Sequence, residues 1–90
     1  MVVMDQDPRP PAENKSRLEK CFADVFGAKA LQQMDSLSFG SVAWDSVSHV
    51  ALVTEMETAF EIELTPEDIT ELTGYPHAKT ILRRHGIAIE

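Results

Sequence analysis

The 90-residue sequence has no long apolar run, one cysteine and only four glycines. No run approaches the roughly 18 residues that a membrane-spanning helix needs. The start is too short for a secretory signal, so we expect a soluble, cytoplasmic protein without a membrane partner. Cys21 has no second cysteine, which excludes an intramolecular disulfide and a paired-cysteine zinc site. With so few glycines, the sequence also offers no glycine-rich phosphate loop.

Lys and Arg are missing altogether between Ala30 and Ala78, a stretch that contains nine acidic residues and carries a charge of −9. The remaining residues together carry +2. Such a charge distribution argues against a nucleic-acid partner, whose phosphates an acidic surface repels. It favours a protein partner with a basic patch, attracted by the field of the acidic part. The alternative is that the acids only keep a small domain soluble.

The apolar periodicity predicts an all-α fold, a four-helix bundle with a short third helix and a long loop between helices one and two. The proline-rich residues 1–12 are expected to form a flexible leader, and residues 13–90 the folded domain. The first helix should begin at Asn14 and stop before Gly27. Residues 28–44 form the long connection, whose apolar side chains should pack on the core: Leu31, Met34, Leu37, Phe39 and Val42.

The second helix is predicted from about Val47 to Phe60, with Asp45 or Ser46 as its N-cap. At 100° per residue, one face should point to the core, formed by His49, Leu52, Val53, Met56 and Phe60. A second stripe is small and uncharged, consisting of Val47, Ala51, Thr54 and Thr58. This stripe has the character of a contact surface, although small residues also simply suit a helix.

The last two helices have clear start signals. Thr65 followed by Pro66 predicts the start of a short third helix, and Gly74 its end. The fourth helix should begin near Tyr75 and close at Gly86. No strand signal of useful length is present.

Ser46 is the residue most suited to carry chemistry. With His49 three residues later it could form a nucleophile–base pair, but we expect His49 to face the core and Ser46 to be exposed, which argues against a hydrolase. The histidines lack the spacing of a metal site, so no metal is expected. An exposed serine at a helix N-terminus offers backbone N–H groups to a phosphodiester. A plain capping role is the alternative.

The run Trp44-Asp45-Ser46-Val47-Ser48-His49 and the segment 55–69, EMETAFEIELTPEDI, resemble the acyl carrier protein family, most closely its standalone Trp-Asp-Ser members. The resemblance covers residues 37–85. In that family a phosphopantetheinyl transferase attaches 4′-phosphopantetheine from coenzyme A to the serine, and the thiol of this arm holds acyl groups as thioesters. The resemblance therefore implies that Ser46 is the attachment site and that the chain is a carrier and not an enzyme.

A second serine matches the family's Asp-Ser-Leu tripeptide more literally. Asp35-Ser36-Leu37 is identical to it, whereas Asp45-Ser46-Val47 has valine in place of leucine. Context favours Ser46, because an amphipathic helix follows it and Phe60 begins the Phe-x-Ile segment at the spacing that the family requires. No such helix follows Ser36.

The resemblance also implies roles for other residues. Recognition of partner enzymes would involve Asp45, Val47, Ala51, Thr54, Glu57 and Thr58. A pocket for the acyl chain would be lined by His49, Val53, Met56, Ile69, Leu72, Ala78 and Leu82, which otherwise are ordinary core residues. We expect a monomer whose partners are the transferase and acyl-loading or acyl-using enzymes of fatty-acid, polyketide or specialised lipid synthesis. A peptidyl carrier and an unmodified interaction module are the alternatives.

Overall fold

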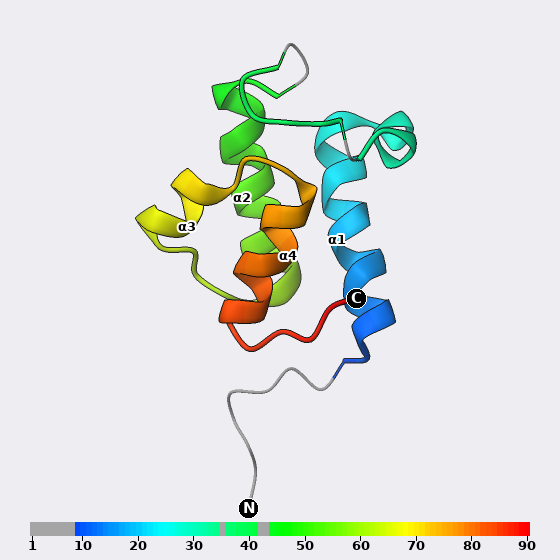
Figure 1. The fold of residues 1–90 in the computed structure, drawn as a ribbon, viewed down its shortest axis with the longest axis vertical. Coiled ribbons are helices and arrows are strands. Elements are labelled where there is room, and N and C mark those ends of the chain that lie inside the picture. The colour runs from blue at the N-terminus through cyan, green and yellow to red at the C-terminus, as the bar shows by residue number, and fades with distance from the viewer. Residues whose placement is uncertain (1–8, 35, 42–43) are drawn as a thin grey trace, which may run out of the picture.

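The structure, a computed structural model, describes residues 9–34, 36–41 and 44–90. It contains four α-helices, α1 Pro11–Phe26, α2 Ser46–Phe60, α3 Pro66–Glu71 and α4 Tyr75–Arg84, and a short 3-10 helix, η1 Ala28–Gln32 (Figure 1). Within these ranges there is no strand, only an isolated antiparallel bridge between Ser38 and Gly74. Among the described residues, none of the helices combines the length and the apolar character that a membrane span requires. The predicted all-α class with a short third helix is confirmed.

Helix α1 begins earlier than the sequence indicated, at Pro11 and not at Asn14. Proline suits the first helical position because its φ is already helical and it has no N–H to leave unpaired. The first residues of α1 thus fall within the predicted leader 1–12, of which residues 1–8 lie outside the described part. The helix ends as predicted at Gly27, whose φ of 94° is accessible to glycine.

The connection between α1 and α2 packs only in part as predicted. Leu37 is buried and Met34 packs against the core. Leu31 and Phe39, however, are 45% and 44% exposed, so the prediction that they pack inside was wrong. Apolar character alone does not decide burial in an irregular segment, where no periodicity fixes which side chains face inward. Val42 lies outside the described residues.

An aromatic cluster ties this connection to α1 and α4. Trp44 is fully buried and meets the ring of Phe22 edge-on, with centroids 5.8 Å apart, and Phe26 at 5.2 Å. Phe22 also meets Tyr75 edge-on at 5.5 Å. Edge-to-face contacts between large rings add to the stabilisation that burial of their surface provides. The cluster therefore holds the chain just before Ser46 against the core.

Helix α2 contributes the centre of the core. Its predicted core face is confirmed for four buried residues, which are Leu52, Val53, Met56 and Phe60. They pack in one apolar cluster with residues from the other helices, including Leu18, Leu72, Ala78, Ile81 and Leu82. The cluster is continuous, so the helices share a single core.

The C-terminal segment returns to the start of α1, as Figure 1 shows. Asn14 is fully buried there, and its Nδ2 donates a hydrogen bond of 2.8 Å to the carbonyl of Ala88. Ile87 and Ile89 are buried on either side of that carbonyl, and Arg83 donates to the carbonyl of Ile89. These contacts fasten the last residues of the chain to the helices.

The C-terminal end of α2 is stabilised by cationic side chains that lie outside the helix. No basic residue lies in the last turn of α2. The guanidinium groups of Arg9 and Arg17 donate to the carbonyl of Ala59 over 3.2 and 3.5 Å, and Arg9 also lies over the ring of Phe60. Positive charge stabilises the carbonyl end of a helix, where the last oxygens have no partner within the helix.

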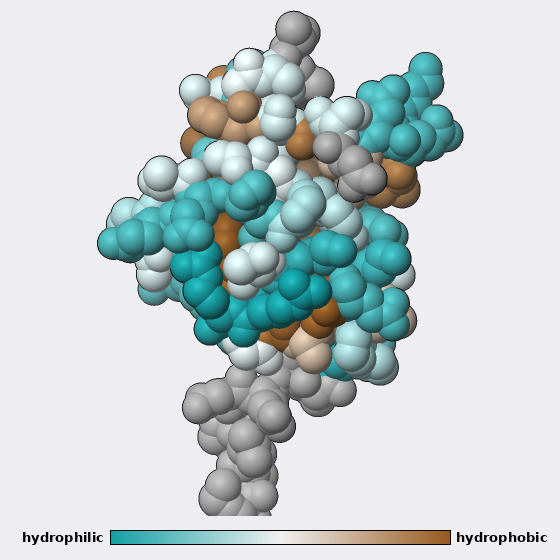
Figure 2. Space-filling view, viewed as in Figure 1, coloured by the Kyte–Doolittle hydropathy of each residue, from teal (hydrophilic) through white to brown (hydrophobic). Residues whose placement is uncertain are grey.

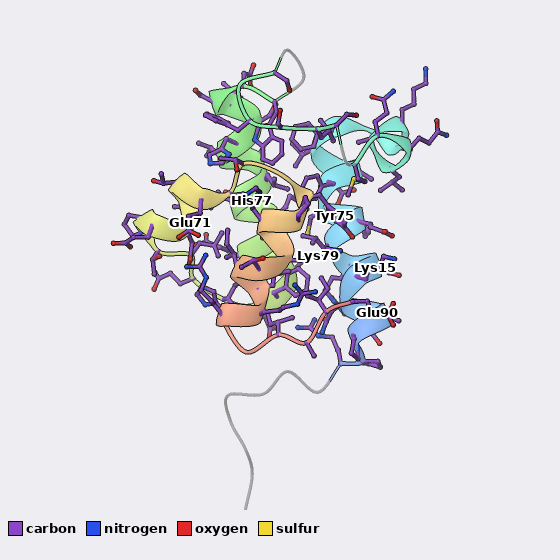
Figure 3. All side chains as sticks on the ribbon, viewed as in Figure 1. Lys15, Glu71, Tyr75, His77, Lys79 and Glu90 are labelled. Carbon is purple, nitrogen blue, oxygen red and sulfur yellow. The ribbon has the colours of Figure 1, made fainter. Side chains whose placement is uncertain are left out.

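Helix α3 starts with a complete capping box. The hydroxyl of Thr65 accepts the N–H of Asp68, and the carboxylate of Asp68 accepts the N–H of Thr65. The same buried carboxylate is 2.7 Å from Nε2 of His85, beyond the end of α4. Arg84 pairs with Glu71 at 2.7 Å (Glu71 is labelled in Figure 3). Polar contacts thus join α3 to α4.

Replacement of Glu61 tests the backbone at the end of α2. Glu61 has a left-handed conformation, with φ 55° and ψ 47°. This conformation costs a non-glycine residue about 1–2 kcal/mol. We expect Glu61→Gly to raise the free energy of unfolding by about 0.5–1 kcal/mol, measured in urea. Glu63→Gly is the matched control, because it removes the same charge at a negative φ, and it should not stabilise. A less stable Glu61→Gly protein would contradict this reading.

Replacement of Asp68 tests the α3–α4 junction. Burial by itself raises the pKa of Asp68, but hydrogen bonds from His85 and Thr65 outweigh burial and lower the pKa below 3.8. The folded state therefore favours the carboxylate, and this stabilisation is present above about pH 4 and lost as the pH falls through the lowered pKa. We expect Asp68→Asn to cost about 1–3 kcal/mol at neutral pH.

The pH dependence of the free energy of unfolding separates the loss of the Asp68 carboxylate from a general defect in packing. The free energy of unfolding of the wild-type protein should fall more steeply below about pH 4 than that of Asp68→Asn, so that the difference between the two shrinks in acid. Parallel pH profiles for the two proteins would show that the Asp68 carboxylate does not stabilise the fold.

Candidate functional site

Ser46 is the first residue of α2, and Asp45 is its N-cap. The carboxylate of Asp45 accepts the backbone N–H of Ser48 at 2.9 Å, which satisfies one of the free donors at the helix start. This hydrogen bond lowers the pKa of Asp45 below its ordinary value. The sequence left the cap open between Asp45 and Ser46, and the structure assigns it to Asp45.

The side chain of Ser46 is exposed, and its hydroxyl has no hydrogen-bond partner among the described residues. Ser36, the more literal match, has a different environment. It lies in a turn after η1, and its hydroxyl donates to the carbonyl of Gln33 at 3.0 Å. The expected helical context of Ser46 is therefore confirmed, whereas its modification remains a prediction.

The surface beside Ser46 is apolar. Val47 is 78% exposed and Val50 66% exposed, and both lie on the first turns of α2. Phe39 adds a half-exposed ring from the connection, and Figure 2 shows apolar surface at the top of the molecule, near the start of α2. Val50 was missed by the sequence analysis. Its spacing of three residues from Val47 was the available signal, because side chains at that spacing are neighbours on a helix.

The other residues predicted to contact partners fall into two groups. Ala51, Thr54 and Thr58 are exposed along α2, as a contact surface requires. Glu57 is half-buried, and its carboxylate accepts the backbone N–H of Leu64 at 2.9 Å. It holds the connection between α2 and α3, a role that the sequence did not indicate.

His49 is half-buried and uses both ring nitrogens in hydrogen bonds. Nδ1 lies 3.0 Å from the indole Nε1 of Trp44, and Nε2 lies 2.8 Å from the carbonyl oxygen of Ile69. The indole can only donate and the carbonyl can only accept, so Nδ1 is the acceptor and Nε2 carries the proton. Neither nitrogen is available to activate the hydroxyl of Ser46.

The residues proposed as an acyl pocket belong to the core or border it. Four of them are fully buried, and these are Met56, Leu72, Ala78 and Leu82. Val53 is also buried, while Ile69 packs against the cluster from α3. The structure thus brings together residues from α2, α3 and α4. Their close packing is what an ordinary core would show, and also what a closed acyl pocket would show.

Cys21 is buried, as the sequence suggested. Burial, with smaller contributions from the charges of Glu55 and Asp24, raises the pKa of its thiol to about 11. The thiol is therefore protonated at neutral pH and a poor nucleophile. The described residues contain no group of three or more side chains placed to hold a metal ion.

No family model, curated protein or solved structure is significantly similar to this chain. The likeness to acyl carriers therefore rests on the residues around Ser46 and on the segment that follows it.

Removal of the Asp45 carboxylate tests the start of α2. We expect Asp45→Ala to lower the thermal unfolding midpoint at neutral pH, because the N–H of Ser48 loses its acceptor. Asp45→Asn should keep most of the stability, since asparagine is also a good N-cap. Differential scanning calorimetry on the three proteins measures this, and equal midpoints for Asp45→Ala and the wild type would rule out a capping role.

Proposed function

We propose that this protein is an acyl carrier protein that bears 4′-phosphopantetheine on Ser46, in a four-helix bundle of the acyl-carrier type. The observation that carries the proposal is the position of Ser46. It is exposed on the first turn of α2, directly after a capping aspartate, and its hydroxyl has no partner among the described residues. The resemblance of the Trp44–His49 run to the carrier family supplies the chemistry.

The residues at this site suit a covalent phosphodiester. In the proposed modification, a separate transferase joins the oxygen of Ser46 to the phosphorus of the phosphopantetheine unit of coenzyme A. The bond to the nucleotide breaks, the hydroxyl proton leaves to a base of the transferase, and adenosine 3′,5′-bisphosphate departs. Asp45 fixes the helix start, and the N–H end of α2 favours the negative phosphodiester. The terminal thiol of the attached arm supplies the thioester.

The surface of α2 would then contact partner enzymes. Val47, Ala51, Thr54 and Thr58 are exposed along this helix, which contains no Lys or Arg. Together with the acids of residues 30–78, this surface suits enzymes with basic patches, approached by electrostatic steering. We propose a cytoplasmic monomer that serves fatty-acid, polyketide or specialised lipid synthesis.

Accommodation of an acyl chain would require the core to open between α2, α3 and α4. The proposed lining is His49, Val53, Met56, Ile69, Leu72, Ala78 and Leu82. Ile69 is only partly buried, so the edge where α3 meets α2 is the shallowest part of this lining.

Two alternatives remain. A peptidyl carrier would use the same serine and arm with an amino acid as cargo. An interaction module would keep the fold and the acidic surface without modification, and the exposure of Val47 and Val50 next to Ser46 is compatible with it. Whether the serine is modified separates the carriers from the interaction module.

Mass spectrometry tests the modification. After incubation with coenzyme A and a broad-specificity phosphopantetheinyl transferase, we expect the purified chain to gain the mass of one phosphopantetheine group. Ser46→Ala should abolish the gain completely, and peptide mapping should place the group on Ser46.

Two controls make the result specific. Ser36→Ala tests the more literal Asp-Ser-Leu match, and Ser48→Ala tests a serine on the same helix turn; both proteins should still be modified. A gain lost only in Ser36→Ala would overturn the site. No gain with several transferases would favour the interaction module.

A further inference from the structure

The indole N–H of Trp44 is a polar group inside the aromatic core. The residue is fully buried, and its ring packs against Phe22 and Phe26. The hydrogen bond to Nδ1 of His49 satisfies this donor. A buried donor without an acceptor is destabilising, so the position of Trp44 depends on the state of the His49 ring.

Only one protonation state of His49 fits both of its hydrogen bonds. Nδ1 must offer a lone pair to the indole, and Nε2 must carry a proton for the carbonyl of Ile69. A proton added to Nδ1 would place two donors opposite each other across 3.0 Å. The bond to Ile69 would survive, because Nε2 carries a proton in both states.

The described residues around His49 offer no carboxylate to pair with a charged ring. Within the described residues, no acid lies at ion-pair distance from either ring nitrogen. On the neighbouring elements, Asp45 is bonded to Ser48, Asp68 to His85 and Glu71 to Arg84, while Lys79 lies over the ring of Tyr75 and Arg83 donates to Ile89. Glu67 on α3 and His77 on α4 are exposed. Residues 36–41 and Trp44 contain no titratable side chain.

We propose that His49 is a proton-sensitive latch. As a neutral imidazole it ties the buried indole of Trp44 to α2 and, through Ile69, to α3. Uptake of one proton from solvent at Nδ1 breaks the bond to Trp44 and leaves the bond to Ile69 intact. Because Trp44 immediately precedes Asp45 and Ser46, its release loosens the chain that leads into α2. This inference is independent of whether Ser46 is modified.

Protonation of His49 should change some contacts of the fold and leave others intact. The helices, the core face of α2 and the capping box of α3 do not involve the His49 ring and should persist. The environment of Trp44 and the backbone of residues 38–41 and 44–46 should change together with the charge of His49. General acid unfolding would instead affect all helices at once.

Nuclear magnetic resonance on the ¹⁵N-labelled full chain tests the latch, and the single tryptophan gives one indole signal. The ring nitrogens of His49 should show the Nε2–H tautomer at about pH 8, and the indole N–H should be protected from exchange. As the pH is lowered, the indole signal should shift together with the ¹⁵N signals of the His49 ring. Its exchange with water should rise about tenfold, as expected for the loss of one hydrogen bond.

Two variants assign the effect. His49→Gln should remove the pH-dependent step in the indole signal, and His77→Gln, which alters an exposed histidine at the start of α4 (labelled in Figure 3), should leave it unchanged. If His49→Gln does not fold, the wild-type titration decides alone. The proposal is overturned by an Nδ1–H tautomer at neutral pH, or by an indole signal that stays unchanged until the His49 ring is fully protonated or the helices unfold.

Discussion

The buried indole of Trp44 and its one acceptor constrain the whole end of the molecule at which Ser46 lies. Packing against Phe22 and Phe26 requires the ring to be inside, and the ring carries a donor that must be satisfied there. His49 satisfies it and thereby commits its other nitrogen to donate to Ile69. The packing of the Trp44 ring thus determines the tautomer of His49. Through its two hydrogen bonds, this tautomer links the connection between α1 and α2 to α2 itself and to α3.

Helix α3 depends on such polar contacts more than on its apolar surface. With six residues it is far too short to be stable alone. Its start is fixed by the capping box with Asp68, which also reaches His85, and its end by His49 and by the pair Glu71–Arg84. A separation of α2 from α3, as an enclosed acyl chain would require, must therefore break the bond between His49 and Ile69.

The parts of the fold that sequence reasoning found are those that rest on local contacts. The cap at Thr65 could be predicted, and that of α2 could be narrowed to Asp45 or Ser46, because a capping side chain bonds a backbone N–H three residues away. The core face of α2 and the exposure of Ser46 followed from helical periodicity. Contacts between distant residues left no local pattern, such as those of Arg9 with Ala59, Asn14 with Ala88 and His49 with Ile69. The burial of Trp44 belongs with them, because the rings against which it packs lie on α1.

The charge at the two ends of α2 also depends on both local and distant contacts. The carbonyl end of a helix favours cations, yet α2 contains none, and Arg9 and Arg17 reach Ala59 from outside the helix. The fold therefore obtains its positive charge at one end of α2 without placing a base on the helix surface. The opposite end carries Asp45 and the exposed Ser46 and Val47. In the proposed function, the absence of cations from this helix would suit a surface that meets basic partners.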